Sequence, residues 1–398
     1  MKRMYDTMCE MHFANYRQMF FMSGPRQTGK TTIAKAHSNA YLSWDDESVR
    51  YAIMSGQQQV KELCDKAGVA GEGRKIVAFD EIHKYVRWKN FLKGFFDIHE
   101  SELGIIATGS AKMDVYKRGG DSMMGRYFPY RIHPLSVAEL LDVGLPGERI
   151  LKMPRKIDDD SWEALWRFGG FPEPLLRNSQ AFSNRWNSLR REQLLRTDAR
   201  DLTRIEDLDR LIMLSEVLSN RSGEMLNYSA LGNEVRADEK TVKNWVSVLK
   251  HLFYGFEIKP WFKNVENSLR KTPKWYLRDW GTIGDEGKRF ETMVACHLLK
   301  AVEAWTDLGL GDFELFYLRD KRKREVDFLV SRDGVPWFLA EAKNGDRKVS
   351  DSLQYFQKTI GAQIAVQVVK ELPYCEMDIS QATDPVCVSA RTFLSQLA

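Results

Sequence analysis

The segment MFFMSGPRQTGKTTIAKAH, residues 19–37, joins an apolar run typical of a strand, a glycine-containing turn and a run that can start a helix. Its central part, GPRQTGKT, matches in full the pattern GxxxxGK followed by Ser or Thr. Gly24 and Gly29 let the backbone curl so that its N–H groups point at phosphate, and Lys30 reaches the terminal phosphates. Thr31 supplies a hydroxyl to Mg²⁺. The segment therefore predicts a phosphate-binding loop between a strand and a helix.

We expect this loop and the first turn of the following helix to hold a nucleotide. The predicted nucleotide-binding residues are Gly24, Pro25, Arg26, Gln27, Thr28, Gly29, Lys30, Thr31 and Thr32. The alternative is a surface turn that contains a lysine by chance. The strand-like and helix-like flanks disfavour that alternative.

A second acidic position is needed to hold the metal ion, and residues 75–81, KIVAFDE, supply it. This is an apolar strand that ends in Asp80 and Glu81, the form of a Walker-B strand. We predict that Asp80 binds Mg²⁺ through water and that Glu81 polarises the attacking water as general base. The alternative is two surface acids at the end of a strand. Beside an intact phosphate loop, the pair predicts hydrolysis of the nucleotide as well as binding.

Two positions indicate whether the nucleotide carries guanine or adenine. GTPases need a glycine shortly after the metal-binding aspartate, where this chain has His83. Residues 111–114, AKMD, lack the leading Asn or Thr of a guanine-reading motif. The sequence therefore predicts ATP together with Mg²⁺.

The composition indicates a folded, soluble protein of several domains. The chain has 398 residues, 29% of them charged, and its 59 basic against 55 acidic side chains give a formal charge of +4. These values exclude disordered and collagen-like classes, and the five scattered cysteines predict reduced thiols. No apolar run reaches the length of about 18 residues that a membrane span needs, and acids stand where a signal peptide requires an apolar core. We expect a cytoplasmic protein without a membrane partner.

Hydrophobic patterns divide the chain into two α/β parts around a helical middle. Strand-like runs at 19–22, 40–44, 75–79 and 104–108 alternate with helical stretches, which is typical of a mostly parallel sheet. Residues 158–256 have a helical pattern. Strand-like runs return at 313–318, 326–330 and 337–340, before a helix at 350–360. The predicted fold class is α/β.

Five segments resemble the AAA-type P-loop ATPases of bacteria and archaea that carry a C-terminal domain of unknown function. In chain order they are GPRQTGKTT, FDEIHKYVRWKNFLKGFFD, ATGS, GRYFPYRIHPLSVAEL and GGFPEPL. The resemblance spans roughly residues 15–360. Together with the hydrophobic pattern it implies an AAA-like P-loop ATPase domain at 1–155, a helical lid and winged-helix region at 156–265, and a restriction-endonuclease-like α/β core at 266–398.

The resemblance also implies two residues that act on the γ-phosphate. ATGS resembles the sensor-1 strand of the family, which places Ser110 near the γ-phosphate. Gly125 and Arg126 resemble its arginine-finger segment, with Arg131 as the competing candidate. A guanidinium offsets the charge that develops on the transferred phosphoryl group, and a finger that acts in trans requires a homo-oligomer. The alternative for Arg126 is a structural salt bridge.

Residues 227–253 indicate two helices joined by a tight turn. In the second helix one apolar stripe contains Val242, Trp245, Val246, Leu249 and Leu252. Lysines lie off this stripe, and strand-like runs at 256–261 and 274–278 follow. The pattern resembles a winged helix whose second helix contacts the DNA major groove. The alternative is an ordinary helical hairpin or a protein-docking surface.

The last part of the chain contains the restriction-endonuclease-like signature. Asp327 lies on an apolar strand, Glu341 and Lys343 end another strand on one face, and Glu291 precedes them in a helix-like stretch. We predict that Asp327 and Glu341 bind Mg²⁺ and that Lys343 orients or activates a water. The basic run at 319–324 either meets a nucleic-acid backbone or forms a solvated hairpin tip. The alternative for the acids is a lysine–carboxylate network without chemistry.

Together these patterns predict an AAA-type ATPase that binds and hydrolyses ATP and is coupled to winged-helix and nuclease-like parts acting on DNA. The predicted catalytic residues are Glu81, Ser110, Arg126 and Lys343. The alternative function is a nucleotide-sensing regulatory or binding platform whose nuclease-like part is catalytically silent.

Overall fold

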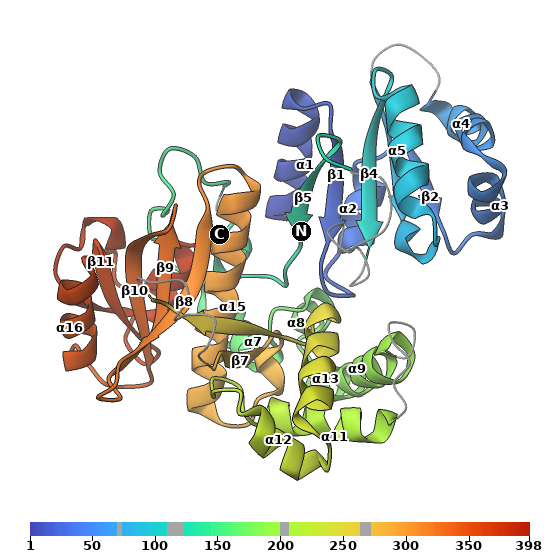
Figure 1. The fold of residues 1–398 in the computed structure, drawn as a ribbon. Coiled ribbons are helices and arrows are strands. Elements are labelled where there is room, and N and C mark those ends of the chain that lie inside the picture. The colour runs from blue at the N-terminus through green and yellow to red at the C-terminus, as the bar shows by residue number, and fades with distance from the viewer. Residues whose placement is uncertain (70–73, 110–122, 143, 200–206, 263–271) are drawn as a thin grey trace. The chain divides into compact units, whose positions relative to one another are not determined.

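The structure is a computed structural model that describes residues 1–69, 74–109, 123–142, 144–199, 207–262 and 272–398 (Figure 1). Contacts within the chain separate two units, Met1–His133 and Pro134–Ala398. The domain boundaries at 155/156 and 265/266 stay predictions. The five cysteines are free, as predicted. None of the described helices combines the length and the apolar character that a membrane span requires.

The first unit is built around a parallel sheet. Its elements are α1 (Met4–Asn15), β1 (Met19–Ser23), α2 (Lys30–Ala36), β2 (Ala40–Ser43), α3 (Glu47–Ser55), α4 (Gln57–Cys64), η1 (Asp65–Val69), β3 (Lys75–Asp80), η2 (Ile82–Lys84), α5 (Trp88–His99), β4 (Leu103–Gly109) and β5 (Tyr127–Arg131). The strand order is β2-β3-β4-β1-β5, and every pair is parallel, which confirms the predicted sheet. The sequence did not predict β5, an edge strand with exposed Phe128 and Pro129 in place of a continuous apolar run.

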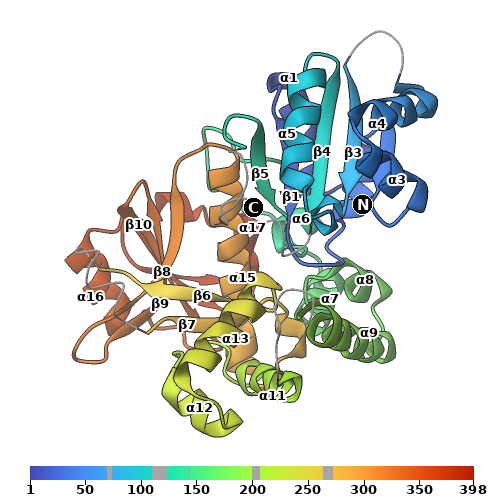
Figure 2. The same cartoon turned by 45° about the vertical axis from the view of Figure 1, so that its right-hand side comes forward.

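The parallel register brings the carboxyl ends of the central strands to one edge of the sheet. Phe21 of β1 pairs with Ala107 of β4, and Val77 of β3 pairs with Ile105 of β4. These strands are buried on both faces, which explains their continuous apolar runs. Helix α5 lies along this sheet (Figure 2). Its apolar stripe, which includes Phe95, packs into the same core. The carboxyl ends of β1, β3 and β4 therefore lie beside one another.

The second unit contains a helical first half and a sheet in its second half. Its helices are α6 (Val137–Leu140), α7 (Asp159–Phe168), α8 (Pro172–Arg177), α9 (Gln180–Glu192), η3 (Gln193–Asp198), α11 (Leu208–Ser219), α12 (Tyr228–Val235), α13 (Glu239–His251), η4 (Trp280–Thr282), α15 (Glu286–Asp307), α16 (Asp351–Ile360), η5 (Ile379–Gln381) and α17 (Ala390–Ser395). Its strands are β6 (Gly255–Pro260), β7 (Lys274–Leu277), β8 (Phe313–Arg319), β9 (Glu325–Arg332), β10 (Val335–Lys343), β11 (Ile364–Val369) and β12 (Val386–Ser389).

These strands form one mixed sheet in the order β12-β11-β10-β9-β8-β6-β7. The strands and the helix predicted for residues 313–360 are confirmed as β8, β9, β10 and α16. Ala340 of β10 pairs antiparallel with Phe328 of β9 and parallel with Val366 of β11. The long helix α15 packs its buried side chains against this sheet, and α16 contributes Leu353 and Phe356 to the core.

The helix pair of the middle region forms where the sequence predicts it. Four residues of the predicted stripe are buried in α13 and the fifth, Leu252, is buried at its C-cap, which confirms the stripe. Strands β6 and β7 follow as an antiparallel pair, with Phe256 opposite Tyr276. Lys259 of β6 also pairs with Phe316 of β8, so both strands belong to the seven-stranded sheet (Figure 2). The winged-helix assignment stays a prediction.

Candidate functional site

The phosphate-binding loop follows β1 at the carboxyl edge of the first unit's sheet. The backbone passes so close to the end of β5 that a Cβ on Gly24 would lie 2.2 Å from the carbonyl oxygen of Ile132. Gly29 has a left-handed φ of 95° and caps α2. Gly24 can have no Cβ, and Gly29 needs a positive φ. Glycine is the only residue that meets both requirements without steric cost. The local structure therefore requires the two glycines that the motif contains.

Lys30 is the first residue of α2, and its side chain folds back over the loop. Its Nζ donates to the carbonyl oxygens of Gly24 at 2.9 Å and Pro25 at 2.6 Å. The residue is 6% exposed, and burial lowers the pKa of Lys30 to about 8, while the charges of Glu81 and Asp80 partly oppose this change. The ammonium thus lies in the loop, near two acids, and is largely shielded from solvent.

Asp80, at the end of β3, is the centre of a hydrogen-bond cluster. Its Oδ2 accepts from the Thr31 hydroxyl at 3.0 Å and from the Tyr41 hydroxyl at 2.5 Å, and its Oδ1 accepts from Thr108. The structure therefore brings together Thr31 and Asp80, the two residues predicted to hold Mg²⁺. Oxygen donors of this kind suit a hard divalent cation, so the donor set fits the predicted ion.

Glu81 follows Asp80 in a left-handed conformation with φ of 56°. Its backbone N–H donates to the Thr108 hydroxyl at 3.2 Å. Its carboxylate oxygen Oε2 lies 3.5 Å from Lys84 Nζ and 3.7 Å from His83 Nε2. A residue other than glycine costs free energy at positive φ, and backbone strain of this kind is concentrated at functional sites. Glu81 is therefore held beside the loop by its own backbone and by Thr108.

The remaining loop residues divide into buried and exposed positions. Thr28 is fully buried, and its hydroxyl donates to the Pro25 carbonyl at 2.9 Å. Gln27 and Thr32 are exposed, and Arg26 is half-buried. The side chains of the buried positions therefore shape the loop, while those of the exposed positions remain accessible.

Three residues that the sequence did not single out support this site. Arg3, just before α1, donates from Nη1 to the Thr28 carbonyl at 2.6 Å and from Nη2 to the His133 carbonyl at 2.8 Å. Tyr41 and Thr108 hold Asp80 from the neighbouring strands β2 and β4. Thr108 could have been found, because it lies in the ATGS segment at the end of a predicted strand. Nothing in the sequence pattern indicates Arg3.

The structure places only some of the residues that the resemblance assigns to the γ-phosphate. Ser110 lies outside the described residues. Arg126 forms a two-bond ion pair with Asp97 of α5, from Nε to Oδ1 at 2.7 Å and from Nη2 to Oδ2 at 3.0 Å. The hydrogen bond from Arg126 lowers the pKa of Asp97. Arg131 ends β5, in register with Ser23. The arginine-finger role of Arg126 stays a prediction.

The acids of the C-terminal sheet are occupied by protein groups. Glu341 Oε1 lies 2.8 Å from Lys343 Nζ, and the hydroxyl of Ser350 donates to its other oxygen. Asp327 Oδ2 accepts the backbone N–H of Ala342 at 3.0 Å. In the described part of the chain no group of three or more His, Cys, Asp or Glu side chains has the geometry to hold a metal ion. Mg²⁺ binding by Asp327 and Glu341 stays a prediction.

Glu291 of α15 and Asp327 instead face a lysine that the sequence did not single out. Lys274 Nζ lies 3.3 Å from Glu291, 2.6 Å from Glu325 and 3.5 Å from Asp327. Burial opposes the charge of the ammonium, but the three carboxylates raise the pKa of Lys274. Burial also raises the pKa of Glu291, and the charge of Asp327 adds to this change. The Lys274 ammonium therefore provides a positive charge shared by these three carboxylates.

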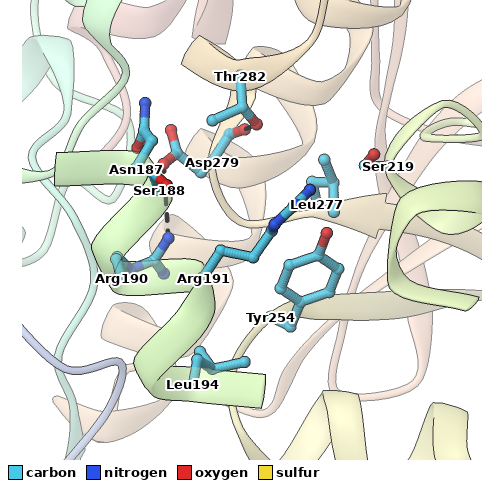
Figure 3. Close-up of a pocket in the computed structure, with 10 residues that line it drawn as sticks. All are labelled: Asn187, Ser188, Arg190, Arg191, Leu194, Ser219, Tyr254, Leu277, Asp279 and Thr282. Atoms are coloured by element: carbon cyan, nitrogen blue, oxygen red, sulfur yellow. Dashed lines mark hydrogen bonds and ion pairs between the residues drawn. The ribbon is translucent and has the colours of Figure 1, made fainter. Parts of the chain in front are cut away.

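A cavity of about 340 Å³ lies elsewhere in the second unit. It is lined by Asn187, Ser188, Arg190, Arg191, Leu194, Ser219, Tyr254, Leu277, Asp279 and Thr282 (Figure 3). Arg190 stacks on the ring of Phe171, 3.9 Å from its centroid, and its Nη1 lies 3.5 Å from the buried carboxylate of Asp279. Burial raises the pKa of Asp279. The sequence did not predict this cavity, because its walls come from segments far apart in the chain.

Comparison with protein families matches three consecutive parts of the chain. Residues 16–141 match the AAA domain family, residues 159–284 a domain of unknown function, DUF8612, and residues 286–380 another, DUF4143. The chain therefore contains an AAA domain followed by a C-terminal DUF4143 domain, which confirms this part of the resemblance.

Two similar proteins come from a bacterium and an archaeon. An uncharacterized protein of Mycobacterium tuberculosis is 20% identical over 342 residues, which cover 84% of this chain and 72% of the relative. An uncharacterized protein of Methanocaldococcus jannaschii is 24% identical over 289 residues, covering 65% of this chain and 60% of the relative.

Two solved structures are distant neighbours. The Aeropyrum pernix ORC1 protein, solved in complex with DNA, is 12% identical, with 70% of this chain and 86% of that chain covered and a TM-score of 0.33. C. elegans PCH-2 is 14% identical, with 61% and 65% covered and a TM-score of 0.24.

Proposed function

We propose that this protein is an ATPase that binds ATP with Mg²⁺ at residues 24–32 and hydrolyses it to ADP and phosphate. One observation carries the proposal: the Thr31 hydroxyl and the Asp80 carboxylate lie 3.0 Å apart beside the buried ammonium of Lys30. These are the hydroxyl, the acid and the cation that a triphosphate with its metal requires. The match of residues 16–141 to the AAA domain family supports the same assignment.

Each residue has a distinct role in the proposed reaction. The loop N–H groups and Lys30 orient the phosphates, and Thr31 with Asp80 provides oxygen donors for the metal. Mg²⁺ neutralises charge on the phosphates when bound. Glu81 accepts a proton from the attacking water as general base. Tyr41 and Thr108 keep Asp80 oriented through hydrogen bonds.

The proposed arginine finger connects the reaction to a homo-oligomer. Arg126 is paired with Asp97 within its own chain, so its guanidinium must exchange this partner for the γ-phosphate of a neighbouring copy. The ion pair is partly exposed, and exposed pairs contribute only about 0 to 1 kcal/mol. That exchange therefore costs little free energy.

For the second unit we propose the regulatory alternative, a platform whose nuclease-like part is catalytically silent. The supporting observation is that Lys274 contacts Glu291 and Asp327, and Lys343 contacts Glu341. A nuclease would use these acids to bind metal. DNA contact through α13 has weaker support than the sequence suggested, because two of its lysines pair with carboxylates.

Two substitutions test the ATPase proposal. Lys30→Ala is expected to abolish ATP binding in calorimetry. Glu81→Gln should retain ATP and lose about 10² to 10⁴ in phosphate-release rate, because a positioned base typically contributes that factor. Glu47→Gln, an exposed acid of α3, is the matched control and should leave both values unchanged. An unaltered rate in Glu81→Gln would remove Glu81 from its role, and normal ATP affinity in Lys30→Ala would refute the binding site.

A cleavage assay tests the silent platform. The wild-type protein is incubated with Mg²⁺ or Mn²⁺, ATP, and plasmid or oligonucleotide substrates. We expect no cutting under any of these conditions. Cleavage that disappears in both Asp327→Ala and Lys343→Ala would show that the nuclease alternative is correct.

A further inference from the structure

Lys274 places its charge among a group of carboxylates. It begins β7 and is 4% exposed. Its Nζ contacts one oxygen each of Glu291, Glu325 and Asp327 at 2.6 to 3.5 Å. The carboxylates come from helix α15 and strand β9, so the ammonium joins three elements of the second unit. The ring of Tyr317 lies 5.7 Å from Nζ and adds a cation–π contact.

Other groups of the protein also contact the three carboxylates. The Tyr276 hydroxyl donates to Glu291 at 2.6 Å, and Arg319 Nη1 lies 3.2 Å from the second oxygen of Glu325. Asp327 receives the N–H of Ala342 on its other oxygen. No carboxylate of the three therefore depends on an external cation, because each has a protein donor in addition to Lys274.

A buried ammonium and a divalent cation compete for the same position. Oxygen ligands surround Mg²⁺ at 2.0 to 2.1 Å and Ca²⁺ at about 2.3 to 2.6 Å. The Lys274 ammonium contacts these oxygens at 2.6 to 3.5 Å, so a metal could enter only if Lys274 left. Moving the ammonium away would break its contacts with three carboxylates, and separating the partners of a buried ion pair is strongly destabilising. The donor set therefore does not fit a metal while Lys274 is present.

We propose that Lys274 takes the place of a divalent cation in the nuclease-like cluster, so that this part of the chain is held together by an internal cation and binds no catalytic metal. This inference rests on the silent platform proposed above and names the residue responsible. It goes further in one respect. The three carboxylates do not have the geometry of a metal site as they stand, and removal of the ammonium would leave their negative charges free to draw together around a divalent cation.

Mn²⁺ titration with the full chain tests the proposal. All samples carry Asp80→Asn, so that the acids of the nucleotide site give no signal, and no nucleotide is added. Binding is measured by calorimetry and by the electron paramagnetic resonance of free Mn²⁺. The Lys274→Met variant should bind one Mn²⁺ at least about tenfold more tightly than the protein with Lys274, because the competing charge is gone. Adding Glu325→Gln to Lys274→Met should remove this gain.

Lys250→Met is the matched control, because Lys250 pairs with another carboxylate of the same unit, Glu257. It should bind Mn²⁺ no better than the protein with both lysines. Lys274→Gln provides a second variant that keeps a hydrogen-bond donor, and refolding of either variant only when Mn²⁺ is present would also support the proposal.

Two results would overturn the proposal. The first is tight Mn²⁺ binding by the protein that retains Lys274, when that binding is lost in Asp327→Asn. The second is a folded Lys274→Met protein that binds no more Mn²⁺ than its parent. If both Lys274 variants fail to fold with and without Mn²⁺, the Mn²⁺ titration of the protein that retains Lys274, with and without Asp327→Asn, decides the question by itself. ATP hydrolysis is measured separately with Asp80 intact, so loss of the ATPase proposal leaves the Mn²⁺ result unaffected.

Discussion

Raising the pH should weaken nucleotide binding before it damages the fold, because the cation of the phosphate loop is buried. Burial lowers the pKa of Lys30 to about 8, with Glu81 and Asp80 partly offsetting this change. An anionic triphosphate stabilises the protonated form, so the complex keeps its ammonium charged to a higher pH than the free protein does. Between the two pKa values, ATP must bind together with a proton.

The magnitude follows from this linkage. Each pH unit above the pKa of the free protein lowers the protonated fraction tenfold, which corresponds to about 1.4 kcal/mol of binding free energy. The ATP affinity should therefore be nearly constant from pH 6.5 to 7.5 and roughly tenfold lower at pH 9.

The stability of the free protein should change in the opposite direction. An unfolded lysine has a pKa of about 10.4, so between pH 8 and that value the unfolded chain binds more protons than the folded chain at this position. Stability rises with pH wherever the unfolded state binds more protons. Lys30 therefore contributes an increase in unfolding free energy over the same pH range in which ATP affinity falls.

Calorimetric titration of ATP with Mg²⁺ between pH 6.5 and 9.5 measures the effect. The Lys30→Arg variant is the control, because a guanidinium remains protonated across this range, and its affinity should be independent of pH. A wild-type affinity that is equally independent of pH up to 9.5 would refute the reasoning, since it would mean that the ammonium of Lys30 is not the group that titrates.

Three further predictions concern the residues around the loop. Thr108→Val removes a donor to Asp80 and should lower the unfolding free energy in urea by about 1 to 3 kcal/mol and slow ATP turnover, so unchanged turnover would speak against a positioning role. Arg3→Gln removes a charged donor to the Thr28 carbonyl and should cost about 1.5 to 3 kcal/mol of unfolding free energy, again by urea titration; no loss would contradict the buried contact. Arg126→Ala should slow hydrolysis at unchanged ATP affinity, and mixing it with Lys30→Ala protein should restore activity if the arginine acts in trans.

Much of the fold follows from patterns that are local in sequence. The predicted strands β1, β3 and β4 are found because each is a continuous apolar run, as expected for central strands buried on both faces. Strand β2, at one edge of the sheet, alternates buried and half-buried residues. The stripe of α13 is found because the helical period places its residues on one side. The edge strand β5 was missed, since an edge strand needs no continuous apolar run.

The candidate site was predictable to the extent that it lies within one motif. Lys30 and Thr31 lie within the loop, and Asp80 ends an apolar strand, so residue type and spacing were enough. Residue type and spacing also identified Asp327 and Glu341 in the C-terminal part, but they did not identify Lys274, the lysine that faces Asp327. Nothing in the spacing around Asp327 indicates that Lys274 would face it.

By itself the sequence determined that a phosphate loop, an acidic strand end and a parallel sheet are present, because these features depend on backbone freedom at a few glycines and on the burial of short apolar runs. Only the tertiary structure decided which side chains meet. Tyr41 and Thr108 reach Asp80 because neighbouring strands end at one edge. Lys274 reaches its carboxylates because β7, β9 and α15 pack together. Such contacts depend on the relative placement of distant segments, which periodicity along the chain does not encode.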